Sequence, residues 1–277
     1  MPSIEDQLTK IYVFVDDYLK QHSELAQWRT TNNTEPRFSD AEVLTVALAQ
    51  GCLGVQSLKE SYLQIRDNHG GAFPHLPSYQ RLIARLQTLD HLIGGLLISS
   101  TALLTDEPSL YLIDSKPIPL CHPLRHGRVR LLRDDGAYFG KTQKGWFFGF
   151  KLHALRHVNG RVVNLILTPG NWADRDATVA LLMAANAGVV IGDLGYSGRF
   201  FQDSIIEQTD VLVLTRQDAP DKKKLLSQVR QRIETTFSQL WYDFIDRVFS
   251  RSWRGLWITL RLKVLFYNLC QASVISM

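Results

Sequence analysis

Three acidic residues stand in apolar surroundings where a carboxylate needs a partner. Asp114 lies within the apolar run YLIDSKP, Asp193 directly follows the run VVIG, and Glu234 lies in RQRIETTFSQL. A charged group in such surroundings destabilises the fold unless it is paired or coordinated. Two carboxylates on neighbouring strands also repel each other and raise one pKa, and a divalent cation between them removes that penalty. Because hard oxygen ligands select Mg²⁺ or Mn²⁺, the pattern predicts a site for one of these ions.

Each acid also has an ordinary structural role open to it. Asp114 can form an ion pair with Lys116 or Lys151. Asp193 can cap a helix or form a turn, and Glu234 can pair with the arginine one helical turn before it. For any one residue alone these roles stay open. The occurrence of all three acids, in this order and on these elements, favours the metal site.

Apolar runs predict the strands and helices that must position these acids. The predicted strands cover residues 109–120, 146–156, 161–170, 188–198 and 210–216. A helix is expected over 174–185, a long helix with an apolar stripe over 226–244, and a last helix over 256–273. Strand and helix signals in this order are typical of an α/β domain with a mixed sheet and flanking helices.

The first hundred residues have a different, helical pattern. Apolar residues recur at three- to four-residue spacing over 4–19, SDAE at 39–42 is a capping-box signature, and a further helix is expected over 76–99. We therefore expect a small all-helical domain at 1–105, followed by the α/β domain at 106–277 with a basic insertion at 121–145. Arg81 and Arg85 share one helix face, either as part of a DNA-recognition helix or, as we prefer, as a solvated face.

Composition restricts the class of protein. The chain has 277 residues, 45% of them hydrophobic, and a formal charge of +4, which is compatible with nucleic-acid binding. Its three cysteines (Cys52, Cys121 and Cys270) are scattered, so we expect neither a disulfide framework nor a zinc site. We read no signal peptide and no membrane-spanning run, and expect a cytoplasmic protein.

The most basic segment lies between the first two predicted strands, next to the strand that carries Asp114. Its cationic residues are Arg125, Arg128, Arg130, Arg133, Lys141 and Lys144. We expect them to contact DNA phosphates, although a solvated loop or a dimer interface would have the same composition. In the later GNWADRDA segment, Trp172 can stack on an extruded base, but packing in the core is the more usual role.

Five spaced motifs resemble those of the DDE transposases of bacterial insertion sequences. They are YLIDSKPIPLC, WFFGFKLH, LTPGNWADRDA, VVIGDLGYSG and RQRIETTFSQL, followed by SRSWRGL…LCQA. The resemblance implies an RNase H-like catalytic core and a catalytic triad of Asp114, Asp193 and Glu234. It covers the chain from Leu110 onward, and the N-terminal helices resemble the family's DNA-binding region in type only.

One part of the family pattern is incomplete. Related families place Tyr seven residues before the catalytic Glu, Arg four before it and Lys seven after it, whereas this chain has Ser227, Arg230 and Trp241. Only Arg230 matches. We therefore expect other residues to share in DNA binding beside the acids, and the candidates are Arg232, Lys144 and Lys151.

The resemblance implies cleavage of double-stranded DNA at the element's ends and joining of the 3′-OH to target DNA. The cofactor would be two Mg²⁺ or Mn²⁺ ions per active site, which activate the nucleophile and stabilise the leaving oxygen. Since two ends must be held at once, a homodimer in the synaptic complex is implied, in the bacterial cytosol or nucleoid and without a membrane. Two alternatives stay open: an RNase H-like nuclease or junction resolvase that only hydrolyses, and a catalytically dead DNA-binding relative.

Overall fold

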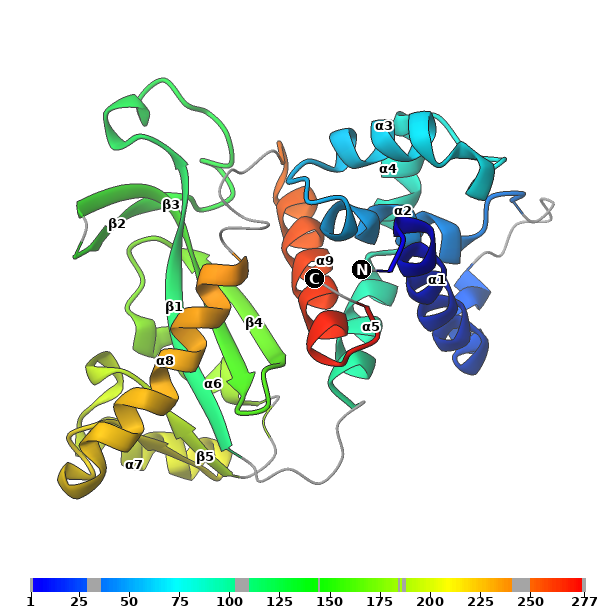
Figure 1. Cartoon of the computed structure of the whole chain (residues 1–277). Helices are drawn as coiled ribbons and strands as arrows, with labels where there is room; N and C mark the ends of the chain where they lie inside the picture. Colours follow the sequence, from blue (N-terminus) through cyan, green and yellow to red (C-terminus); the bar gives the residue numbers. More distant parts are fainter. Residues whose placement is uncertain are drawn as a thin grey trace. The chain divides into compact units, whose positions relative to one another are not determined.

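The computed structural model describes residues 2–28, 36–102, 110–143, 145–183, 185, 188–240 and 250–275. Contacts divide these residues into two units (Figure 1). The first unit contains the described residues up to 102, residue 250 and residues 254–275. The second contains residues 110–240 and 251–253 of the described chain.

A six-stranded mixed sheet forms the centre of the second unit. The strands are β1 (Leu110–Cys121), β2 (Tyr138–Thr142), β3 (Gly145–His157), β4 (Val162–Pro169), β5 (Gly188–Ile191) and β6 (Val211–Leu214). Strand β3 pairs antiparallel with β1 on one side and with β2 and β4 on the other. Strand β5 lies parallel between β1 and β6. The sheet is thus antiparallel on one side of β1 and parallel on the other.

Helices pack against both sides of this sheet (Figure 1). They are α6 (Thr178–Leu182), α7 (Arg199–Thr209) and α8 (Lys223–Leu240), with short 3₁₀ turns at η3 (Pro123–Arg125), η4 (Asp174–Ala177), η5 (Leu194–Tyr196) and η6 (Pro220–Lys222). Helix α8 contacts β1, α6 contacts β3 and β4, and α7 contacts β6. The α/β class with a mixed sheet and flanking helices is therefore as expected.

Strand β1 delivers neighbouring side chains to opposite sides of the sheet. Tyr111 and Ile113 belong to the buried cluster that also contains Leu181 of α6 and Ile205 of α7. Since side chains alternate along a strand, Ser115 projects to that same side and Asp114 to the side of α8.

The first unit is built of helices. They are α1 (Ile4–Gln21), η1 (Ser23–Trp28), α2 (Asp40–Cys52), α3 (Leu58–Asn68), η2 (Gly70–Ala72), α4 (Tyr79–Thr88), α5 (Asp90–Ala102) and α9 (Trp253–Gln271), of which Trp253 groups with the second unit. The capping box expected at α2 is present, since Glu42 N donates to Ser39 Oγ at 3.1 Å and Ser39 N donates to Glu42 Oε2. None of the helices in the described ranges is long and apolar enough to cross a membrane.

Helix α9 departs from the division expected from the sequence, which assigned all of 106–277 to one domain. It groups with the first unit. Asn268 donates to Ser100 Oγ at 3.1 Å, and Arg254 donates to the carbonyl of Gln87 at 2.7 Å. A Cβ on Gly51 of α2 would overlap the ring of Phe266, so α2 and α9 approach closely. The end of the chain thus completes the helical unit.

Candidate active site

Asp114 lies in the middle of β1, where its carboxylate accepts a hydrogen bond from Ser115 N at 2.8 Å. Burial raises the pKa of Asp114 to about 7. Burial is the largest cause of this shift; the hydrogen bond from Ser115 N and the charge of Arg230 oppose the rise in pKa, and the carboxylates of Asp193 and Asp174 contribute to it. The ionised form of Asp114 is therefore disfavoured in the protein without metal, and a cation bound beside it would stabilise that form, as expected for a metal ligand.

Asp193 lies two residues after the end of β5 and caps the turn η5. Its Oδ1 accepts a hydrogen bond from Gly195 N at 2.7 Å. The turn-forming role that the sequence left open for Asp193 is therefore present, with the carboxylate held at the carboxyl end of a buried parallel strand. Leu112 of β1 pairs with Ile191 of β5, so Asp114 and Asp193 each come two residues after a residue of this pair.

Glu234 lies on α8 and forms an ion pair with Arg230 one turn earlier. Both side chains are partly exposed, at 47% for Glu234 and 32% for Arg230. They line a cavity of about 450 Å³ together with Asp193. The ion pair considered for Glu234 is thus formed, but inside a cavity that contains a second predicted acid.

The donor chemistry of the predicted triad fits a hard divalent cation. Asp193 acts electrostatically on Asp114 and raises its pKa, so a cation placed between the two carboxylates would be favoured. Within the described part of the chain, however, no three His, Cys, Asp or Glu side chains are close enough to hold one ion together.

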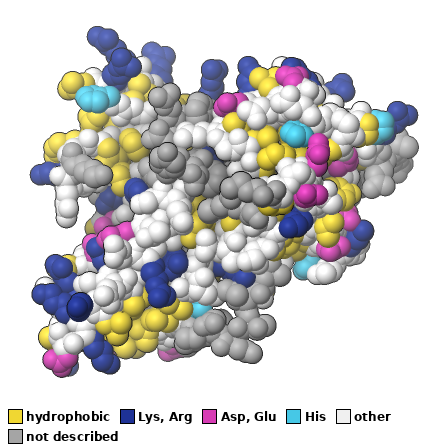
Figure 2. All heavy atoms as spheres, viewed as in Figure 1, with side chains coloured by type: hydrophobic (Ala, Val, Ile, Leu, Met, Phe, Trp, Pro, Cys, Tyr) yellow, Lys and Arg dark blue, Asp and Glu magenta, His cyan; other side chains and the backbone are white. Residues whose placement is uncertain are grey.

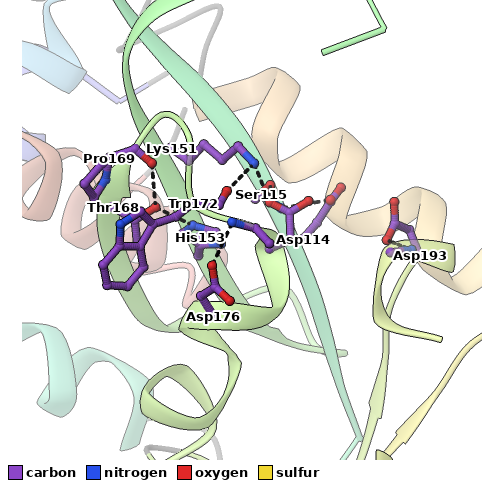
Figure 3. A network of polar contacts seen from close by, with 12 residues as sticks. Asp114, Ser115, Lys151, His153, Thr168, Pro169, Trp172, Asp176 and Asp193 are labelled. Carbon is purple, nitrogen blue, oxygen red and sulfur yellow. Dashed lines mark hydrogen bonds and ion pairs between the residues drawn. The ribbon is translucent and has the colours of Figure 1, made fainter. Parts of the chain in front are cut away.

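Two of the cations predicted to contact DNA form ion pairs with acids of the same unit of the protein. Lys151 Nζ donates to the carbonyl of Trp172 at 2.8 Å and to Asp174 Oδ1 at 3.1 Å (Figure 3). Arg85 pairs with Asp40 at 2.6 Å and donates to a backbone carbonyl. The solvated face that we preferred for Arg85 does not describe this contact, which ties α4 to the start of α2.

The basic insertion forms a loop after β1 whose arginines differ in their surroundings. Arg125, Arg128 and Arg130 are exposed, and Figure 2 shows Lys and Arg side chains gathered at the top left of the view, over this loop. Arg133 is exposed too, but it also donates to the carbonyl of His126 at 2.7 Å and lies over the ring of Phe148. The loop is thus anchored to β3 by Arg133.

The remaining predicted contacts are on the surface or outside the described residues. Arg81, Arg232 and Lys141 are exposed, and Lys141 lies over the ring of Trp146. Lys144 is outside the described residues. Trp172 is 45% exposed, so the preferred interpretation of core packing is wrong for its side chain.

Two further sets of residues at this site were missed in the sequence. Arg216, which follows β6, lines the same cavity as Asp193, Arg230 and Glu234. Its position next to Asp193 follows from the parallel pairing of β5 with β6, and an arginine just after a predicted strand was the available signal. Asp174 and Arg175 make the contacts described below, and their signal was the run of charges in ADRDA.

Comparison with protein families gives one match. Residues 105–241 match the family described as Transposase DDE domain. The chain carries a transposase DDE domain. This DDE domain coincides with the mixed sheet and its helices and contains Asp114, Asp193 and Glu234. Neither the comparison with curated proteins nor that with solved structures found a match. Membership supports a transposase-type function and DNA as the class of substrate.

Proposed function

We propose that this protein is a DDE transposase that cleaves DNA at the ends of an insertion sequence and joins the exposed 3′-OH to target DNA. The observation that carries this proposal is a cavity within the DDE domain that two of the three predicted acids line, beside the strand that carries the third. Asp193 and Glu234 line one cavity, and Asp114 is under the electrostatic influence of Asp193 and of Arg230 from the same cavity.

The strand arrangement supports an RNase H-like core for this domain. Antiparallel strands β3 and β4 are joined through β1 to the parallel strands β5 and β6. Asp114 lies on β1 and Asp193 follows the adjacent parallel strand β5, which supports a role for both acids in one site. Helix α8 adds Glu234 from the layer that packs on β1.

Asp114, Asp193 and Glu234 would hold Mg²⁺ or Mn²⁺, two ions per site in the full mechanism. Such ions supply an activated nucleophile and stabilise the leaving oxygen. Arg230 and Arg216 supply positive charge on the walls of the cavity and would contact phosphates beside the scissile bond. The loop with Arg125, Arg128 and Arg130 would hold the flanking duplex.

The two proposed reactions differ only in the nucleophile. In the first, the oxygen of a water attacks the phosphorus and the bond to the 3′ oxygen breaks, which leaves a 3′-OH and a 5′-phosphate. In the second, that 3′-OH attacks a phosphate of the target, and the target's own 3′ oxygen leaves with the proton. Direct attack requires no covalent enzyme intermediate. Two copies of the chain would hold the two ends, and the helical unit would bind DNA.

A strand-transfer assay tests the proposal. The full chain is incubated with Mg²⁺, a supercoiled target and labelled duplexes made from the DNA that flanks its coding region. We expect cleavage at the 3′ end and joined products, both abolished by Asp114→Asn, Asp193→Asn and Glu234→Gln with DNA binding retained. Cleavage without joining would favour a nuclease or resolvase. Binding without either reaction would favour a dead relative, and full activity in excess EDTA would contradict the metal site.

A further inference from the structure

The turn η4 contacts both acid-bearing elements of the sheet through two adjacent residues. Asp174 contacts residues of β1 and β3, and Arg175 contacts the turn η5 that follows β5. Asp114 belongs to the first of these elements and Asp193 to the second. Figure 3 shows the polar contacts around Ser115 and Lys151, with Asp114 beside Ser115 and Asp193 farther to the right of the view.

The contact of Asp174 reaches Asp114 through Ser115. Ser115 Oγ donates to Asp174 Oδ1 at 2.7 Å, and the backbone N–H of Ser115 donates to Asp114 Oδ1 at 2.8 Å. The same residue therefore orients the carboxylate of Asp114 and is itself held by η4. Lys151 donates to the same Oδ1 of Asp174 at 3.1 Å, which balances the charge of Asp174 and fixes its position.

The contact of Arg175 reaches Asp193 in the same way, through Gly195. Arg175 Nε donates to the carbonyl of Gly195 at 2.7 Å, and a second guanidinium N–H donates to the carbonyl of Ser197. The N–H of Gly195 donates to Asp193 Oδ1 at 2.7 Å. A single peptide group, Gly195, therefore connects the guanidinium of Arg175 with the carboxylate of Asp193.

We infer that Asp174 and Arg175 are positioning residues that together fix the separation of the Asp114 and Asp193 carboxylates for cation binding. Each carboxylate is oriented by one N–H, and the residue that supplies this N–H is held by η4. The two holding residues are consecutive, so the distance between the acids is set by one short, rigid turn. Partners that orient metal ligands in this way affect metal affinity about 10- to 100-fold when they are removed.

Two other roles for these residues are less consistent with their contacts. As a direct ligand, Asp174 would need its carboxylate free of Lys151, but the two form an ion pair with side chains only 32% and 14% exposed. As a contact to DNA, Arg175 would have to turn its guanidinium toward a phosphate, but two of its nitrogens donate to backbone carbonyls and the group lies over the ring of Phe201.

Calorimetric titration of the full chain with MnCl₂ alone tests this inference, which rests on the proposed function. The variants are Arg175→Gln, Arg175→Lys, Asp174→Asn and the double variant. Arg199→Gln is the matched control, since the side chain of Arg199 is 95% exposed and its ion pair with Asp203 is long, at 3.9 Å. Melting temperature and hydrogen exchange of the 192–198 segment are measured in parallel, without metal.

We expect each single glutamine or asparagine variant to weaken Mn²⁺ binding about tenfold or more, and Arg175→Lys to keep an intermediate affinity. Both contacts are needed together to fix the separation, so the loss of one already removes the effect. The double variant should therefore bind Mn²⁺ no more weakly than the single variant with the lower affinity. Exchange of 192–198 should rise in Arg175→Gln, and Arg199→Gln should bind Mn²⁺ like the wild type.

The inference is overturned if the wild type binds Mn²⁺ and both Arg175 variants bind it equally well. It is also overturned if only Asp174→Asn weakens Mn²⁺ binding, which would make Asp174 a ligand. A fall in Mn²⁺ affinity that only follows the fall in melting temperature would overturn it too, because it would show a general loss of stability. A wild type that binds no Mn²⁺ would instead contradict the metal site of the proposed function. Arg175→Lys keeps the positive charge but loses the paired hydrogen bonds to Gly195 and Ser197. Its Mn²⁺ affinity therefore tests the inference even if Arg175→Gln does not fold.

Discussion

Arg230 and Glu234, one turn apart on α8, form an ion pair in the cavity that Asp193 also lines. The same guanidinium lowers the pKa of Asp114 against the opposing effect of burial. One side-chain cation therefore acts on acids from two different elements. In the protein without metal, Arg230 supplies part of the positive charge that a bound divalent cation would supply.

Replacement of Arg230 should change metal and DNA binding in opposite directions. Without its charge, Arg230→Gln should bind Mn²⁺ more tightly, by up to about tenfold, because a cation beside the acids repels another cation. If Arg230 also contacts a phosphate, the slope of log affinity for DNA against log salt should fall by about 0.9. Calorimetry and a salt titration measure the two effects. Arg199→Gln, an exposed arginine on α7, is the control, and weaker Mn²⁺ binding by Arg230→Gln would contradict this role.

Stability should depend on pH through Asp114. Burial raises the pKa of Asp114 from 3.8 to about 7, so the folded state binds a proton that the unfolded state has lost between these values. This contribution to stability is complete below pH 4 and is lost as the pH rises through 7. In EDTA, Asp114→Asn should therefore match the wild type near pH 4 and exceed it by up to roughly 4 kcal/mol above pH 7.

Urea unfolding at several pH values measures this difference. Asp134→Asn, which removes an exposed carboxyl from the basic loop, is the control. Equal stability of Asp114→Asn and the wild type at pH 8 would show that the carboxylate of Asp114 is not destabilising in the folded protein. Addition of Mn²⁺ should reverse the order, because only the wild type has the ligand.

A methyl group at Gly195 should displace the carboxylate of Asp193. A Cβ at this position would lie 2.8 Å from Asp193 Oδ1, closer than side chains pack. Gly195 is exposed and is not among the glycines with positive φ, so Gly195→Ala should fold normally. We expect Mn²⁺ binding to weaken at least about tenfold. Gly127→Ala is the control, because a Cβ at Gly127 has no atom within 4 Å. Unchanged metal binding by Gly195→Ala would show that the turn η5 does not position Asp193 for metal binding.

Local sequence patterns were sufficient for the elements that carry the acids. Apolar runs predicted β1, β3, β4, β5 and β6, and the stripe of α8 predicted the helix of Glu234. Strand β2 was missed because YFGKT is short and pairs only with β3. Helix α7 was taken as a connection, since it buries only Gln202 and Ile205 and leaves Phe200 90% exposed. The single helix expected over 76–99 is divided into α4 and α5 at Leu89.

The partners of charged side chains could not be predicted in the same way. Lys151 and Arg85 appeared as cations available for DNA, yet each pairs with an acid more than twenty residues away, Asp174 and Asp40 respectively. Such pairs depend on the packing of distant elements, which no local periodicity records. For the same reason Asp174 and Arg175 appeared only as charges in a polar segment, although their contacts connect both halves of the site.

The loop after β1 provides a test of how the duplex is held. All four arginines of the loop are exposed, but Arg133 also contacts His126 and Phe148, so the three others (Arg125, Arg128 and Arg130) are the exposed arginines that we propose for DNA binding. Each arginine that neutralises a phosphate adds about 0.9 to the slope of log affinity against log salt. Replacement of the three exposed arginines by alanine should therefore flatten this slope by up to about 3, with little change in preference among DNA sequences.

Fluorescence anisotropy over a range of salt concentrations measures these slopes for the full chain. Arg133→Ala separates binding from loop structure: it should change the slope by less than one exposed arginine does, while protease cleavage within 122–137 increases. Arg199→Ala, an exposed arginine on α7, controls for loss of surface charge. If the triple variant keeps both the slope and the affinity of the wild type, the loop does not contact DNA, and the phosphates must be bound by the cavity arginines and the helical unit.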